Sequence, residues 1–277
     1  MVNHTPNCAC PGRNISGPMK RSIRQRCGFG CVICGLPIYE YHHMTPWSEI
    51  KEHIAEDITI LCNNCHRRAG AGIIPSEAVR EGDSDPISFR LGTTSPEKVW
   101  YTGHLCRVFF GDLELNFFPV TPVLYPILLD TVPVFGLRMN DGRLSIDLNP
   151  FPSLGRGLKI VDNEIAVAPH WWDVEWIGTC LTIRLAPGEI LFRMRFEPPS
   201  VVRIERALFI HNGLGVAVDD NGLAVLNTRA RIGGLRFDGY RNGLAVGDQL
   251  PVEAAIKVPI LIDDPRRIIP DPPEEGS

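Results

Sequence analysis

Four cysteines near the start of the chain have the spacing of a metal site. They form two C-x-x-C pairs, Cys31 with Cys34 and Cys62 with Cys65, and 27 residues separate the pairs. Each pair can form a tight turn that presents two thiolates, and four thiolates match the tetrahedral coordination of Zn²⁺. The sequence therefore predicts a structural zinc site with these four cysteines as its ligands.

Three histidines lie within or beside the cysteine pairs. His42 and His43 are adjacent between the pairs, and His66 directly follows the last cysteine. A site closed by four thiolates leaves no position for an imidazole, so the histidines need another explanation. A neutral imidazole can bind a divalent ion or take a proton from water near neutral pH. The pattern indicates a separate imidazole centre enclosed by the zinc site.

This stretch resembles the HNH endonuclease family, in which a zinc ribbon often holds a ββα-metal motif. The matching text is Cys31-Val-Ile-Cys34-Gly, then Tyr41-His42-His43-Met44, then Asp57-Ile58-Thr59-Ile60-Leu61-Cys62-Asn63-Asn64-Cys65-His66-Arg67-Arg68. The resemblance covers about residues 24–70, roughly a sixth of the chain. It implies a metal-dependent endonuclease that hydrolyses the phosphodiester bonds of DNA.

The resemblance also implies roles for individual residues. His43 would be the general base, while His42 and His66 would bind a catalytic Mg²⁺ or Mn²⁺. Position 57 departs from the family pattern, because this chain has Asp57 where the family has asparagine. A carboxylate can accept a hydrogen bond from the base or ligate the metal, so both catalytic roles stay open for Asp57. Adjacent histidines on a strand point to opposite faces, and a reversal of their two roles also stays open.

Basic residues are concentrated in the same part of the chain. The net charge is -4, yet residues 1–75 contain eight Lys or Arg and five Asp or Glu, which gives +3. Positive side chains beside such a centre can bind phosphates, although a solvated helix face would explain them equally well. The candidates for nucleic-acid contact are Arg24, Arg26, Arg67 and Arg68.

Local patterns predict the elements that must position these residues. Pro18 and Gly28 are typical start and stop residues of a short helix. In chain order we expect a helix at 18–26, a strand at 39–43, a helical insert at 46–55, a strand at 58–61 and a helix from about residue 62. The last helix carries His66. His53 lies in the insert, where a packing or capping role is favoured over metal ligation.

Composition divides the chain into four parts. We expect an HNH domain with a basic arm at 1–75, a linker at 76–98, a β-rich recognition domain at 99–262 and a disordered tail at 263–277. The β-rich part has short β-branched and aromatic runs between turn signals. The expected fold class is α+β, with a small N-terminal ββα-metal domain and structural zinc, followed by a larger, mostly antiparallel all-β domain.

Two motifs of the β-rich part allow a finer prediction. The sequences starting at Asn212, Asn221, Gly233 and Asn242 share a Gly-Leu ending and are expected to form successive tight turns. The aromatic segment 171–176, which contains three tryptophans, is a candidate recognition surface, although core packing is favoured.

The sequence favours a cytoplasmic nuclease regulated through its β-rich domain. The apolar stretch 117–129 contains three prolines, so we expect no signal peptide or membrane span, and nine cysteines indicate reduced thiols. The architecture is typical of an effector in bacterial defence or on a mobile element, bound by a protein partner or trigger. Oligomeric state is left open. The alternatives are a non-catalytic zinc-ribbon adaptor that binds DNA, and a partner-dependent subunit of a larger nucleic-acid-targeting assembly.

Overall fold

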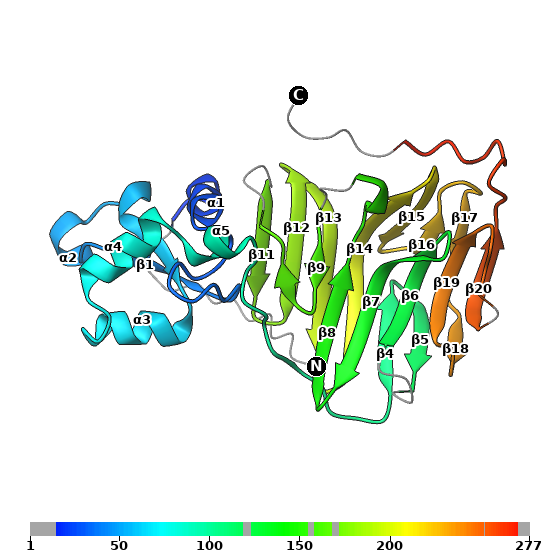
Figure 1. Cartoon of the computed structure of the whole chain (residues 1–277), viewed down its shortest axis with the longest axis horizontal. Helices are drawn as coiled ribbons and strands as arrows, with labels where there is room; N and C mark the ends of the chain where they lie inside the picture. The colour runs from blue at the N-terminus through cyan, green and yellow to red at the C-terminus, as the bar shows by residue number, and fades with distance from the viewer. Residues whose placement is uncertain (1–14, 119–122, 155–157, 168–171, 252, 271–277) are drawn as a thin grey trace.

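The computed structural model describes residues 15–118, 123–154, 158–167, 172–251 and 253–270. They form a small domain of helices around two short strands and a larger domain of two facing β-sheets (Figure 1). The small domain lies at one end of the large one, where helix α1 contacts strand β11. The predicted α+β class is confirmed, with the four-cysteine region first and the β-rich domain after it.

The small domain is built on one antiparallel pair of strands. β1 (Glu40–His43) pairs with β2 (Ile58–Leu61), and all four residues of β2 are buried. The helices are α1 (Gly17–Arg26), α2 (Trp47–Ile50), η1 (Ala55–Asp57), α3 (Asn63–Gly70), α4 (Ser76–Ser84) and α5 (Ile87–Leu91). The predicted order of helix, strand, insert, strand and helix is confirmed. The insert has less helix than expected, because Lys51 adopts a left-handed conformation that ends α2.

The segment at 76–98, which we expected to be a linker, packs onto the small domain. Val79 of α4 is buried in the core of that domain. The backbone amide and hydroxyl of Ser95 donate to the carbonyl oxygens of Gly35 and Cys34, at 2.9 and 2.6 Å. These contacts fix the segment to the first cysteine turn. Composition predicts a linker here, but it does not show the surface on which the segment packs.

The large domain is a sandwich of two sheets. One sheet has the order β10-β9-β8-β7-β6-β19-β20, with β3 beside β8; the other runs from β11 to β17 in chain order and also holds β4, β5 and β18. Neighbouring strands are mostly antiparallel, as predicted, although β19 runs parallel to both β6 and β20, β4 to β14, and β18 to β5. The first sheet comprises β3 (Val99–Trp100), β6 (Val123–Leu129), β7 (Val132–Asn140), β8 (Arg143–Leu148), β9 (Ile160–Val161), β10 (Glu164–Ile165), β19 (Asn242–Gly247) and β20 (Ala254–Pro259). The second comprises β4 (Cys106–Phe110), β5 (Leu113–Phe117), β11 (Asp173–Ile177), β12 (Cys180–Ala186), β13 (Glu189–Glu197), β14 (Val201–His211), β15 (Leu214–Asp219), β16 (Gly222–Val225), β17 (Ala230–Ile232) and β18 (Arg236–Asp238). A short 3-10 turn, η2 (Pro152–Leu154), follows β8.

Both sheets share one apolar core. The ring of Phe135 on β7 lies 5.8 Å from that of Phe192 on β13, across the space between the sheets. Phe110 and Phe209 extend this row of rings from the second sheet. Trp176 is buried in the same core, whereas Trp171 lies outside the described residues. Core packing therefore accounts for at least one ring of the tryptophan segment.

Part of the expected disordered tail has defined contacts. The guanidinium of Arg267 binds the carboxylate of Asp130 and the carbonyl oxygen of Ile260. The amide of Ile269 donates to Gly213, and its side chain packs on the sandwich core. Residues 271–277 lie outside the described part. Among the helices that the structure describes, none has the length and apolar character needed to cross a membrane.

Candidate active site and zinc centre

The four predicted zinc ligands come together in the small domain. The Sγ atoms of Cys31, Cys34, Cys62 and Cys65 all lie within 4.8 Å of one another. In a tetrahedral site with Zn–S bonds of about 2.3 Å, the sulfur atoms are about 3.8 Å apart. The four thiols therefore fit one Zn²⁺ ion, as the spacing predicted.

Local backbone geometry forms each cysteine turn. Gly35 has φ +77° directly after the first pair, and its amide donates to the Cys31 carbonyl at 2.7 Å. The second pair uses a helix start, because Cys62 is the N-cap of α3 and its Sγ accepts from the amide of Cys65 at 3.4 Å. A helix N-terminus favours negative charge, so this position also stabilises thiolates. The zinc centre thus fixes the start of α3.

His42 and His66 meet beside the zinc centre. His42 projects from β1 and His66 from the first turn of α3, and their ring centroids are 5.0 Å apart at 88°. Burial, with smaller contributions from His66 and His43, lowers the pKa of His42 to about 4. The ring is therefore neutral near pH 7 and has a lone pair for a metal. Two neighbouring imidazoles could hold a divalent ion that keeps open positions for other ligands.

Glu40 contacts His66 and was not among the predicted site residues. Its Oε2 lies 3.4 Å from Nδ1 of His66. A carboxylate on the second ring nitrogen typically fixes the tautomer and orientation of a metal-binding histidine. The alternation of a strand places Glu40 on the same face of β1 as His42, and this spacing was the available signal.

His43 points into a different cluster. Its Nε2 is 3.2 Å from Nδ1 of His53, and the rings of His43 and His53 each lie close to Trp47, with centroid distances of 5.4 and 4.7 Å. His42 and His43 thus serve opposite faces of β1, as adjacent strand residues must. The two histidines therefore have different surroundings, His66 on one face of β1 and His53 with Trp47 on the other.

Asp57 holds the two ends of the insert together. Its carboxylate accepts from the amide and hydroxyl of Thr45 at 3.0 and 2.7 Å and lies 3.3 Å from Arg80. The backbone adds a bond from the Met44 amide to the Asp57 carbonyl oxygen. These contacts give Asp57 a role in shaping the loop after His43. Its two catalytic roles remain predictions.

Residues 25–72 match the family model of the HNH endonucleases. The match covers the two strands, the insert, α3 and every cysteine and histidine of the site. We call these elements, together with α1, α4 and α5, the HNH domain. Searches of curated proteins and of solved structures returned no significant match. The family match indicates a nuclease-type function and a nucleic-acid substrate.

Arg24, predicted to contact nucleic acid, joins the HNH domain to the sandwich instead. It is 4% exposed, and its guanidinium binds both carboxylate oxygens of Asp173 on β11 at 2.8 Å. The same group contacts Glu175 at 3.1 Å and the hydroxyl of Tyr41 at 2.7 Å. Burial alone would lower the pKa of Arg24, but these acidic partners raise it above its usual range. The charge of Arg24 is thus paired and buried within the protein, and its predicted contact with nucleic acid stays a prediction that these contacts do not favour.

Arg26 also makes contacts within the HNH domain. Its guanidinium donates to the carbonyl oxygens of Ala55 and Ile58 at 2.9 and 2.8 Å and to Asp83 at 3.0 Å. These bonds connect α1 to the start of β2 and to α4, and the predicted contact of Arg26 with nucleic acid stays a prediction. Arg67 and Arg68 differ, since both are exposed on α3 next to His66.

Replacing Arg24 with methionine should lower the free energy of unfolding by about 3 kcal/mol. The substitution leaves Asp173 buried, and unpaired buried charges cost about 3–5 kcal/mol; Arg184, 2.8 Å from the same carboxylate, limits the loss. Arg231→Met is the matched control, because Arg231 binds Asp219 in the same two-point manner on the surface. Urea titration should show little or no loss of stability for the control, because solvent screens an exposed ion pair. Equal losses would contradict the buried contact.

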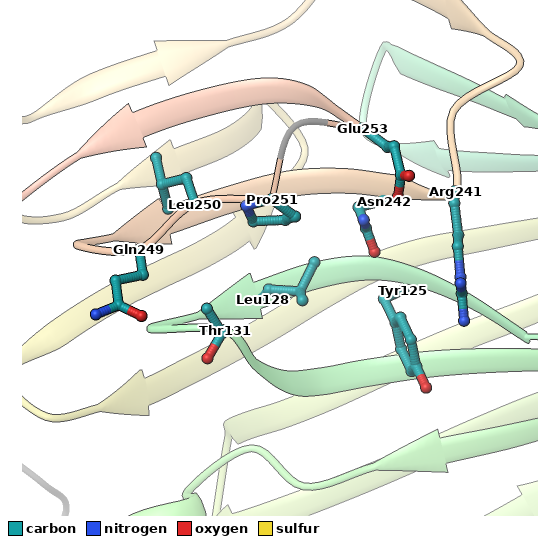
Figure 2. Close-up of a pocket in the computed structure, with 9 residues that line it drawn as sticks. All are labelled: Tyr125, Leu128, Thr131, Arg241, Asn242, Gln249, Leu250, Pro251 and Glu253. Carbon is teal, nitrogen blue, oxygen red and sulfur yellow. The ribbon is translucent and has the colours of Figure 1, made fainter.

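The sandwich has a separate shallow pocket of about 380 Å³ beside strands β6 and β19 (Figure 2). The side chains of Tyr125 and Arg241 stand next to each other at one side, and the guanidinium carbon is 5.9 Å from the centroid of the phenol ring. Leu128 lies between them and Gln249 on the other side. None of the residues that line this pocket is a histidine or cysteine. The pocket offers a binding surface but does not contribute to the candidate active site.

Proposed function

We propose that this protein is a metal-dependent HNH endonuclease that hydrolyses DNA phosphodiester bonds. The observation that carries the proposal is the arrangement around β1. His42 meets His66 of α3 on one face, and His43 is held on the opposite face, all within the family match. A zinc-ribbon adaptor needs the four thiols but none of these three imidazoles, so the arrangement favours an enzyme.

The residues divide the reaction between them. His43 takes the proton of the attacking water, and positioned acid–base catalysis of this kind contributes about 10²–10⁴-fold. His42 and His66 hold Mg²⁺ or Mn²⁺, which when bound stabilises charge on the phosphate and on the leaving oxygen. Arg67 and Arg68 lie exposed on α3 and supply positive charge for phosphates. The products would carry 5′ phosphate and 3′ hydroxyl ends.

The β-sandwich supports a further proposal about regulation. It makes up about two-thirds of the chain and contacts the HNH domain through the buried Arg24. We propose that a protein partner or trigger binds the sandwich, for which the pocket at Tyr125 and Arg241 supplies a surface, and that the protein acts in the cytoplasm as an effector of bacterial defence or of a mobile element.

Metal dependence tests the proposed activity. Plasmid and single-stranded DNA should be cleaved with Mg²⁺ or Mn²⁺ and left intact with EDTA. His66→Ala removes one of two metal ligands, so cleavage should require a higher Mn²⁺ concentration while the zinc content stays at one ion per chain. A concentration dependence equal to that of the wild type would remove His66 from the metal site.

The same assay separates the alternatives. DNA binding without cleavage at any metal concentration would favour the adaptor, and cleavage that appears only in a host lysate fraction would favour the partner-dependent subunit. Gel filtration of the purified protein with that fraction then identifies the assembly.

A further inference from the structure

The insert between β1 and β2 places a fourth histidine, His53, next to His43. His53 follows His43 by ten residues and lies in the stretch between α2 and η1. Both ends of the insert are joined where Asp57 binds Thr45. Between them, Lys51 has φ 56° and its amide donates to the Trp47 carbonyl at 2.9 Å, which turns the chain back. The insert therefore holds His53 against His43.

The contact between the two imidazoles has hydrogen-bond geometry. Nε2 of His43 and Nδ1 of His53 are 3.2 Å apart, and the two rings are tilted by 32°. The ring of His53 also lies on Trp47, with centroids 4.7 Å apart. His53 is thus fixed on two sides, by the indole and by the second imidazole. Packing alone would account for the indole contact but would not require a nitrogen facing Nε2.

We propose that His53 is a positioning residue for His43, which it orients through this nitrogen–nitrogen hydrogen bond. The inference rests on the proposed function of His43 as the general base. A base must keep one ring nitrogen unprotonated toward the attacking water, and the hydrogen bond at the other nitrogen decides which one carries the proton. With Nε2–H of His43 donating to Nδ1 of His53, Nδ1 of His43 is the nitrogen that accepts the proton from water.

Two contacts of the insert keep His53 in place: Asp57 with Thr45 at the ends of the insert, and Trp47 on the ring of His53. Asp57 closes the ends of the insert, and Trp47 covers the ring that must not rotate. A carboxylate at position 57 can serve this purpose, because it accepts both from the Thr45 amide and from its hydroxyl. In this chain the orienting hydrogen bond on the base then comes from His53.

Two substitutions separate the hydrogen bond from the packing. His53→Phe keeps an aromatic ring on Trp47 but has no nitrogen to face His43. His53→Asn loses the ring but places an amide group near the position of Nδ1, so it can restore a hydrogen bond to Nε2. A packing role predicts that phenylalanine is the better replacement, and a positioning role predicts the opposite order.

The first test uses NMR of the zinc-loaded protein without a catalytic ion. Two-bond ¹H–¹⁵N correlation spectra report which nitrogen of His43 is protonated. We expect one tautomer in the wild type and in His53→Asn, and a mixture of tautomers in His53→Phe, all at the same pH. Identical ring-nitrogen shifts of His43 in all three proteins would overturn the proposal. Zinc content and melting temperature confirm that each variant is folded.

The second test uses cleavage kinetics. In His53→Phe we expect kcat to fall by about 10- to 100-fold with little change in KM, as for other groups that orient a functional histidine. His53→Asn should recover most of that loss. A His53→Phe enzyme as fast as the wild type would overturn the proposal. If the wild type cleaves no DNA, the proposed function fails, while the NMR result still decides whether His53 orients His43.

Discussion

Replacing Cys65 with alanine is expected to unfold the HNH domain and to leave the β-sandwich folded. The substitution removes one of four sulfur atoms that lie within 4.8 Å of one another. Structural zinc sites of this kind contribute about 10–16 kcal/mol of apparent binding free energy in small zinc peptides. Whole domains are typically stable by about 5–15 kcal/mol. If the substitution releases the zinc ion, the free energy lost is therefore comparable with the entire stability of a domain.

The HNH domain should depend on its zinc site because it buries few apolar side chains. Its core cluster includes Ile23, Ile58, Ile60 and Leu61, and three of the zinc ligands are themselves members of the cluster. The sandwich has a separate and larger core, with the rings of Phe135 and Phe192 at its centre. Only the first of these cores depends on a metal, so the two domains should respond differently.

Zinc analysis and hydrogen exchange would measure this difference. In Cys65→Ala the zinc content should fall below one ion per chain, and amides of β1 and β2 should exchange rapidly while those of β13 and β14 stay protected. Cys27→Ala is the matched control, because Cys27 is buried in the same core outside the zinc cluster. Its expected cost is about 1 kcal/mol. Wild-type zinc content and protection in Cys65→Ala would refute a stabilising zinc site.

The zinc centre and the ββα unit could be predicted because their signals are local. Two C-x-x-C pairs determine a ligand set whatever the rest of the chain does. The short segments at 39–43 and 58–61, which contain aromatic or β-branched residues typical of strands, correspond to β1 and β2. The hairpin of β12 and β13 also has a local signal, since alternation and a Pro-Gly turn lie within 17 residues.

Features that depend on distant partners could not be predicted. Arg24 lies in a basic stretch of the sequence, as a phosphate-binding residue would. In the structure, however, its guanidinium binds Asp173, which is 149 residues away along the chain. Asn242-Gly243 has the sequence of a tight turn, yet both residues lie in β19. A Cβ at Gly243 would be 2.4 Å from the carbonyl oxygen of Pro126, so this glycine permits a close approach of strands. Sequence pattern alone does not distinguish a glycine needed for a turn from one needed for space.

His53 illustrates the same limit within the site. Its spacing from the other histidines matches no metal motif, and an insert residue is more often used for packing. The left-handed Lys51 and the Asp57–Thr45 contact bring it back to His43, and neither has a strong sequence signal. His42, His43 and His66 have a sequence signal, because they lie between or beside the two cysteine pairs. His53 has none, because loop geometry places it next to His43.

Replacing His43 with alanine should lower kcat for DNA cleavage by about 10²–10⁴-fold, the contribution of a positioned general base. The face of β1 that carries His42 is unaffected, so the Mn²⁺ concentration that gives half-maximal residual activity should stay that of the wild type. His42→Ala should behave differently, because its ring meets His66. It should raise the metal concentration required. This contrast assigns the base and the ligand separately.

The contrast also tests the reversed assignment of the two adjacent histidines. If His42 were the base, His43→Ala would alter the metal requirement and His42→Ala would not. His104→Ala, at an exposed position of the sandwich, controls for loss of an imidazole outside the site. Equal residual cleavage by wild type and His43→Ala, with equal zinc content, would remove His43 from the reaction. In that case His43 would have only a structural role, through its contacts with His53 and Trp47. The neighbouring ring of His42 does not share these contacts, because a strand places it on the opposite face.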